Sequence, residues 1–270
     1  MLHSQTRKTV SIKGFLASFV FVVFIFMLSS CQKEVTGDLG TPNTTPAPPS
    51  TSNNVKTYSI DVSGTNGTHD ITTFNLNYDG SNRITSFVSA TAPGDKIVYK
   101  YNTDNTYTMD IFESNVLSIH EIFYLNNIPL IDSSVQYDNL AKDTTTEKYT
   151  YNSNKEWVSL KTYKYSKLTG ATLLSTANHV YDNNGNIIKE TEGSLVVTYQ
   201  YYPDLVNNLA VGMVYFQQSK NLVKITTETE GISTPKVTTH TYTFDSNNRI
   251  SSEKKVFSNG ADTVIITYTY

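Results

Sequence analysis

The sequence predicts an all-β protein: an antiparallel hairpin meander of about 14–16 strands that forms a barrel-like or strongly curved sheet. Short runs that alternate apolar and polar residues follow one another from Val55 to Tyr270. Clusters of Asp, Asn, Gly and Ser separate these runs, as expected for tight turns. Long amphipathic helical patterns are absent from the sequence, which argues against a mixed fold.

A targeting signal precedes the predicted strands. Arg7, Lys8 and Lys13 form a positive segment, and an apolar run follows from Phe15 to Leu28. This run of fourteen residues is shorter than the ~20 that a membrane-spanning helix needs, and it is typical of a signal peptide. Residues 1–30 are predicted to be a signal peptide, and the residues at the end of the apolar run identify it as a lipoprotein signal.

The string Leu28-Ser29-Ser30-Cys31 at the end of the apolar run resembles the bacterial lipobox. The resemblance implies that Cys31 is lipidated on its sulfur, that the signal is cleaved before Cys31, and that the new amine is acylated. Such an anchor holds a protein on a membrane without a spanning segment. An ordinary secretory signal with an incidental cysteine and an uncleaved anchor are the alternatives. Cys31 is the only cysteine, which excludes a disulfide framework.

The mature chain is acidic and rich in tyrosine. Residues 1–30 hold three of the 21 basic residues and none of the 24 acidic ones, so cleavage leaves 18 basic residues and a net charge of −6. This balance offers no polycation for a nucleic acid. All 19 Tyr but only seven of the 12 Phe remain, which predicts half-buried positions where the ring packs and the hydroxyl stays wet.

Residues 31–54 are predicted to be a flexible tether. Four of the eight prolines lie at positions 42, 46, 48 and 49, among Thr, Ser, Asn and Gly. Such a composition buries no core and is typical of extended linkers. One β domain, residues 55–270, follows the tether. The lipobox places this domain at the outer membrane, facing either the periplasm or the cell surface, and we expect a monomer.

Alternation within the runs predicts strands with one covered face. In the run 96–102, Ile97, Tyr99 and Tyr101 share one face of a strand, and Lys96 and Lys100 share the other. The runs 238–244 and 263–270 alternate in the same way. This period of two is typical of antiparallel sheets that are buried on one side and wet on the other.

An internal repeat marks the turns. Each copy has an aromatic residue, Asp or Asn, two or three turn residues and then an aliphatic residue. Asp or Asn bonds its own backbone two residues on, and Gly or Asn tolerates positive φ, so each copy predicts a tight hairpin. The aromatic recurs at positions 78, 101, 124 and 151, about two strands apart. The strong copies are Tyr78–Ile84, Tyr181–Ile187 and Phe244–Ile250, and weaker ones start at Tyr101 and Tyr151.

The copy Tyr181–Ile187, with Tyr199 and Tyr201 downstream, resembles a YD (RHS-type) repeat. With the lipobox included, the chain resembles uncharacterised Bacteroidetes outer-membrane lipoproteins of this repeat type, some of which have a porin-like β fold. The resemblance covers residues 55–270 and implies an architecture, because that family has no established activity. YD-repeat toxin shells are far longer chains, which argues against a toxin-encapsulating role.

One segment, Pro203 to Phe216, lacks clear alternation. We expect a short helix or an ordered loop here, before a strand that starts near Leu222. The segment is expected to cover one end of the sheet, with a ligand gate as the alternative. The side chains expected to be buried are Leu205, Leu209, Met213 and Phe216.

The histidines give no metal-binding motif. His120, His179 and His240 lie on distant predicted hairpins, and each shares a strand face with an aromatic residue of the repeat; His69 is the fourth mature histidine. If that face lined a lumen, three imidazoles would approach one another, as a zinc site requires. No closely spaced histidine pair supports such a site, so we predict no metal and no cofactor.

Catalytic motifs are also absent from the sequence. It has no Gly-x-Ser-x-Gly elbow and no glycine-rich phosphate loop. A glycosidase acid pair stays open, because such a pair is set by distance in space. Trp157 and the many tyrosines would stack on sugars, but cross-strand tyrosine pairs also stabilise a sheet by themselves. The candidate acids are Glu113, Glu121, Glu190, Glu192, Glu228 and Glu230.

The sequence thus predicts a lipid-anchored envelope lipoprotein that acts as a noncatalytic binding or scaffold module for a glycan or an envelope protein. A glycan-acting enzyme component and an integral outer-membrane pore are the alternatives. A pore needs strands of ~9–11 residues with an uncharged outward band. Many strands are expected to have only seven or eight residues, and Lys161 and Lys164, three positions apart, point to opposite faces. Both features favour a barrel tethered by lipid alone.

Overall fold

The computed structural model describes residues 54–64, 69–209, 219–258 and 263–270. The signal peptide, Cys31 and the tether up to residue 53 lie outside the described residues. The described residues form strands and no helix, so none of them offers a helix long and apolar enough to cross a membrane. The all-β prediction is confirmed. The strands are β1 (Thr57–Ser63), β2 (His69–Tyr78), β3 (Ile84–Ser89), β4 (Lys96–Tyr101), β5 (Thr106–Glu113), β6 (Val116–Leu125), β7 (Ile131–Asp138), β8 (Asp143–Tyr151), β9 (Trp157–Ser166), β10 (Gly170–Tyr181), β11 (Ile187–Glu192), β12 (Leu195–Val206), β13 (Asn221–Glu230), β14 (Lys236–Phe244), β15 (Ile250–Phe257) and β16 (Thr263–Thr269).

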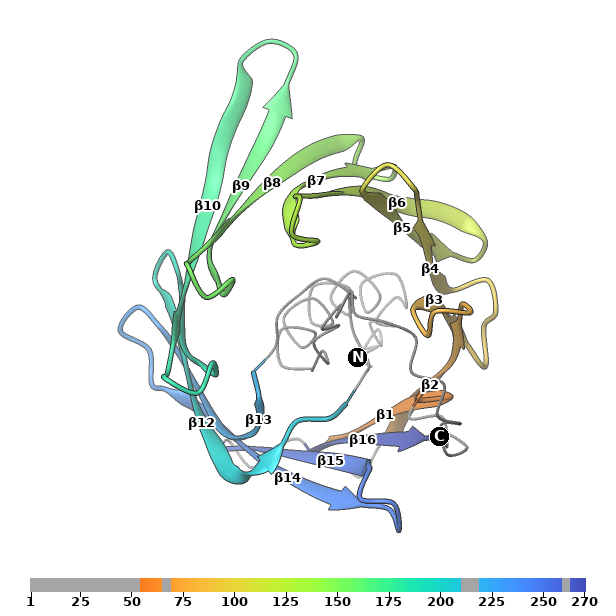
Figure 1. Ribbon diagram of the computed structural model, residues 1–270, viewed down its shortest axis with the longest axis vertical. Coiled ribbons are helices and arrows are strands. Elements are labelled where there is room, and N and C mark those ends of the chain that lie inside the picture. The colour runs from red at the N-terminus through yellow and green to blue at the C-terminus, as the bar shows by residue number, and fades with distance from the viewer. Residues whose placement is uncertain (1–53, 65–68, 210–218, 259–262) are drawn as a thin grey trace, which may run out of the picture.

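The sixteen strands close into a barrel (Figure 1). Each strand pairs antiparallel with its neighbours in the sequence, and β1 pairs with β16 from Thr57 opposite Thr269 to Ser63 opposite Thr263. Closure leaves no edge strand with unpaired backbone groups. The predicted barrel-like meander is confirmed. All copies of the repeat follow even-numbered strands, so they lie at one end of the barrel, which we call the repeat rim.

The turns of the repeat rim share one hydrogen-bond pattern. Oδ1 of Asp79 accepts the backbone N–H groups of Ser81 and Arg83, both at 2.9 Å. Asp182 and Asp245 accept two backbone N–H groups each in the same way. The side-chain acceptor satisfies donors that a three-residue loop leaves without a ladder partner. Asn126 and Asn152 take the same role in their turns.

The third residue after the Asp or Asn lies in the left-handed backbone region. Its φ is 60° at Asn82, 58° at Asn105, 59° at Asn248 and 81° at Gly185. Asn and Gly reach this region at little cost, which is why they recur here. Lys155 is the exception, with a φ of 65° and no such tolerance.

A tyrosine hydroxyl joins neighbouring strands at the repeat rim. The ladder between β9 and β10 ends where Ser159 lies opposite Asn178, and beyond it the hydroxyl of Tyr181 donates to the carbonyl of Trp157 at 2.9 Å. The hydroxyl thereby replaces a backbone donor where the two strands part. The other pairs are Tyr78 with Val55, Tyr101 with Ile84, Tyr151 with Ile131, Tyr201 with Ile187 and Tyr270 with Ile250.

The register separates an inner wall from an outer wall, because residues opposite one another in a ladder share a face. Tyr99, Met109 and Glu121 are opposite one another on β4, β5 and β6, and all three are buried. No described element covers the outside of the barrel, so the buried face is the inner wall. Its core residues nearest the repeat rim include Val55, Leu76, Ile84, Tyr107, Phe123, Ile131, Tyr149, Trp157, Ile250 and Tyr268.

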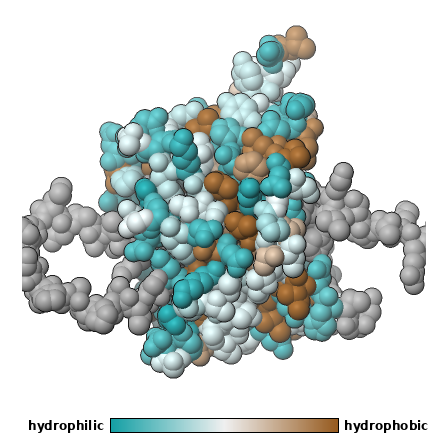
Figure 2. Space-filling view, turned by 90° about the vertical axis from the view of Figure 1, so that its right-hand side faces the viewer, coloured by the Kyte–Doolittle hydropathy of each residue, from teal (hydrophilic) through white to brown (hydrophobic). Residues whose placement is uncertain are grey.

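The outer wall mixes polar residues with exposed apolar ones such as Ile71, Val180 and Val256. On β14, the outward residues Thr239, Thr241 and Thr243 are all exposed. Figure 2 shows one side of this wall, where hydrophilic and intermediate residues surround separate apolar patches. Exposed lysines of the outer wall are Lys100, Lys148, Lys161, Lys189 and Lys254.

Two sequence predictions need correction and one is confirmed. Eight strands have nine or more residues, so the expected length of seven or eight is wrong for half of them. Tyr124 is not a repeat aromatic, because it alternates with the buried Phe123 on β6 and points outward, so that Leu125, opposite Ile131, takes the inner position before the turn. Lys161 and Lys164 do lie on opposite faces, with Lys161 on the outer wall.

Candidate functional site

Buried carboxyl groups line the inner wall, farther from the repeat rim than the aromatic core residues. Glu121 is almost fully buried, and its Oε2 has no hydrogen-bond partner. Glu147 accepts the hydroxyl of Tyr149 at 2.5 Å and that of Ser134 at 3.4 Å. Burial raises the pKa of Glu121, and the neighbouring Glu147 raises it further. These two acids therefore hold protons more tightly than exposed ones do.

A second polar cluster is satisfied by its own members. His240 Nδ1 lies 2.7 Å from Glu253 Oε1, and its Nε2 lies 3.0 Å from the hydroxyl of Thr226. Burial raises the pKa of Glu253, but Lys255 and His240 outweigh it and hold that pKa below its usual value. Because each charge has a partner, we interpret the cluster as a structural ion network of the inner wall.

His179 of β10 is different, because it lacks a full set of partners. Its Nε2 lies 3.5 Å from Glu190 Oε1, its ring packs against Trp157 with centroids 4.3 Å apart, and its buried Nδ1 has no hydrogen-bond partner. Burial lowers the pKa of His179 to about 4 and raises that of Glu190 to about 7. The imidazole is therefore uncharged at neutral pH.

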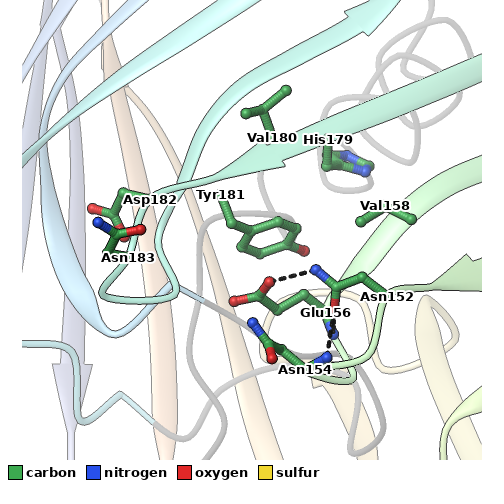
Figure 3. A pocket seen from close by; sticks show the side chains of 9 residues that line it. All are labelled: Asn152, Asn154, Glu156, Val158, His179, Val180, Tyr181, Asp182 and Asn183. Atoms are coloured by element: carbon green, nitrogen blue, oxygen red, sulfur yellow. Dashed lines mark hydrogen bonds between the residues drawn. The ribbon is translucent and has the colours of Figure 1, made fainter.

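His179 lines a pocket of about 420 Å³ at the repeat rim (Figure 3). The pocket forms where β9 and β10 part: beyond Ser159 and Asn178, β9 stays paired with β8 while β10 stays paired with β11. Two segments supply the whole lining. These residues are Asn152, Asn154, Glu156, Val158, His179, Val180, Tyr181, Asp182 and Asn183.

Some polar side chains of the pocket already make hydrogen bonds within their turns, and others remain available to a ligand. Asn152 Nδ2 donates to Glu156 Oε2 at 2.6 Å, as drawn in Figure 3. Both oxygens of Asp182 accept hydrogen bonds within its own turn. The side-chain amides of Asn154 and Asn183 make no hydrogen bond to the described residues and stay open to a ligand or to water.

The three histidines that an alternative zinc site would have required do not come together. His120 lies on the outer wall, where its Nδ1 is 2.5 Å from Asp110 Oδ1, because its strand turns that face outward. His179 and His240 lie on the inner wall but on separate strands with separate partners. His69 contacts Asp61 on the outer wall. Within the described ranges, no group of three or more His, Asp or Glu side chains is placed to hold a metal ion.

The candidate acids are only partly brought together. Glu190 joins His179, and Glu121 lies near Glu147, an acid that the sequence analysis did not name. The signal for Glu147 was present, since it shares a strand face with Tyr149 and the repeat tyrosine Tyr151. Glu192 lies close enough to Glu190 and Glu147 to raise the pKa of both. The remaining acids, Glu113, Glu228 and Glu230, lie elsewhere on β5 and β13, and Cys31 lies outside the described residues.

The segment from Pro203 begins as strand and not as helix. β12 continues to Val206, and Asn221 Nδ2 donates to the carbonyls of Pro203 and Leu205, which holds this stretch extended. Leu205 packs against the core and Leu209 is buried, as expected. The next strand starts at Asn221, close to the predicted position. Met213 and Phe216 lie outside the described residues.

Two solved structures from Bacteroides share this barrel fold. A porin-like protein from Bacteroides uniformis superposes with a TM-score of 0.58 at 14% identity, over 80% of this chain and 97% of that protein. A porin-like protein from Bacteroides vulgatus gives a TM-score of 0.55 at 12% identity, over 80% and 98%. The chain shares its fold with these porin-like proteins. No protein-family model and no curated protein matches the sequence.

Proposed function

We propose that this protein is a lipid-anchored lipoprotein of the outer membrane, of the YD-repeat type, whose barrel stands in water and acts as a noncatalytic binding module. The lipobox ending at Cys31 supports the anchor. The repeated turns at the repeat rim support the repeat type, since their Asp and Asn side chains share one bonding pattern.

The exposed lysines of the outer wall carry the proposal that the barrel stands in water. A membrane barrel presents an apolar band about 25 Å tall to lipid. Here Lys148 and Lys161 lie opposite one another on β8 and β9, both exposed on the outer wall. A lysine near the bilayer midplane costs ~2–4 kcal/mol, so this pair disfavours a lipid-facing wall. Tyrosines such as Tyr99, Tyr107 and Tyr149 gather on the inner wall, and a pocket of ligand size opens at the repeat rim.

An integral pore is the second candidate, because both structural neighbours carry the description porin-like. One experiment separates the two functions. The chain from Gln32 to Tyr270, made without Cys31, is expected to be monomeric and soluble without detergent. Recovery only in detergent, with heat-modifiable migration on gels, would favour the pore.

The anchor is tested in the full-length protein. Metabolic labelling with a palmitate analogue is expected to mark the wild type and not Cys31→Ser, since the sulfur is the predicted acceptor. Equal labelling of both proteins would rule out the lipid anchor.

A further inference from the structure

We infer that the pocket between the β8–β9 turn and the β10–β11 turn is a binding site for a neutral, hydroxyl-rich ligand of the saccharide class. The inference rests on the proposed binding function and names the class of ligand. The pocket volume of about 420 Å³ lies within the ~300–1,000 Å³ of small-molecule sites. Its lining combines one tyrosine ring with amide, imidazole and carboxylate groups.

The unpaired imidazole nitrogen is the first argument for a ligand. His179 is only 6% exposed, it lines the pocket, and its Nδ1 has no partner among the residues that the structure describes. A buried polar atom without a hydrogen bond is unfavourable, so such atoms are normally met by a ligand or an ordered water. Trp157 packs against the ring and holds the orientation of the imidazole.

Charge in the pocket selects against anions and favours a neutral ligand over a cation. The nine lining residues include two carboxylates, Glu156 and Asp182, and no Lys or Arg. An anion would therefore meet two like charges among the lining residues. Both carboxylates already accept hydrogen bonds from their own turns. Lys220 Nζ and Glu156 Oε1 each lie 3.6 Å from where a Cβ of Gly185 would stand, so a positive charge is already close by.

The open groups match hydroxyls, which both donate and accept hydrogen bonds. The amides of Asn154 and Asn183 each offer donors and an acceptor, and a neutral imidazole offers one of each. The ring of Tyr181 is held by its bond to the Trp157 carbonyl and supplies a flat apolar surface. Alternating hydroxyls above a C–H face are the chemistry of a sugar ring.

Fluorescence of the single tryptophan tests the site directly, because Trp157 contacts His179. The mature full-length protein is titrated with maltose, cellobiose and N,N′-diacetylchitobiose, and with glucuronic acid and glucosamine as charged probes. We expect a saturable change with at least one neutral disaccharide and a weaker one or none with the charged probes. Isothermal titration calorimetry gives the matching affinity.

Variants locate the binding in the pocket. Asn154→Ala and Asn183→Ala are expected to weaken binding about fivefold each, the effect of one lost hydrogen bond of about 1 kcal/mol. His179→Phe, which keeps a buried ring, should weaken it more than tenfold. Asn247→Ala is the matched control, because Asn247 has the position of Asn154 in the β14–β15 turn, and binding should not change. A urea midpoint for each variant verifies folding.

Three results would overturn the inference. Binding that survives His179→Phe and both asparagine variants would place the sugar elsewhere. Preference for glucuronic acid or glucosamine, lost in His179→Phe, would reject the neutral class but keep a binding module. No response to any probe would reject the site, whereas the anchor and the water-facing wall are measured separately and would stand.

Discussion

The tyrosine hydroxyls of the repeat rim predict a measurable and local loss of stability. Tyr151 donates to the carbonyl of Ile131 at 2.8 Å, and Ile131 is fully buried. Tyr151→Phe keeps the ring but leaves that carbonyl without its donor. A net hydrogen bond contributes ~0.5–1.5 kcal/mol, and an unsatisfied buried group costs ~1–3 kcal/mol, so we expect a loss of about 1–2 kcal/mol.

Equilibrium unfolding in urea measures this loss as a lower midpoint with an unchanged slope. A shift of Tm by about 2–4 °C per kcal/mol is expected for a domain of this size. Tyr137→Phe is the control, because Tyr137 is 41% exposed on the outer wall and its change should stay within about 0.5 kcal/mol. Tyr78→Phe, on a distant strand, should add to Tyr151→Phe within ~0.5 kcal/mol.

Equal midpoints for Tyr151→Phe and Tyr137→Phe would refute the reasoning. The hydroxyl would then be replaced by water at no cost, and the repeat tyrosines would act through their rings alone. A non-additive double variant would show instead that the turns of the repeat rim fold as one coupled unit.

Two further predictions concern strain and charge. Lys155→Asn should raise the free energy of unfolding by about 0.5–1 kcal/mol in the urea assay, because asparagine tolerates a φ of 65° better than lysine; an unchanged or lower value would contradict the strain. Burial raises the pKa of Glu190 from 4.5 to about 7, so its contribution to stability is full below pH 4.5 and is lost as the pH rises through about 7. The free energy of unfolding of the wild type should therefore fall relative to that of Glu190→Gln as the pH rises from 4.5 through about 7. Parallel pH profiles of the two proteins would show that Glu190 does not titrate in this range.

Much of the wall could be predicted from the sequence, because its signals are local. The alternation in the run 96–102 placed Ile97, Tyr99 and Tyr101 on one face, and the register confirms that they share the inner wall. The Asp of each strong repeat copy bonds backbone groups only two and four residues away, so the turn forms from its own residues. The repeat turns needed no distant contact to be recognised.

The segment from Pro203 shows where local reading fails. It lacks alternation, which suggested a helix or loop, yet Asn221 on the next strand holds it extended. Tyr124 fails for a different reason, since it alternates with the buried Phe123 and therefore lies on the outer wall. The spacing of aromatic residues suggested a repeat position, but the inner position before the turn belongs to Leu125.

The sequence by itself determined the β class, the repeated turns, the expected lipid anchor at Cys31 and an acidic, tyrosine-rich composition. Only the tertiary structure decided that β1 meets β16, which wall each lysine or glutamate faces, and that β9 and β10 part at the repeat rim to bring Asn154, His179 and Asn183 around one pocket. Periodicity shows which residues share a face, because successive side chains of a strand point to opposite faces. Which face becomes the inside, and where two strands separate, depends on closure of the whole sheet.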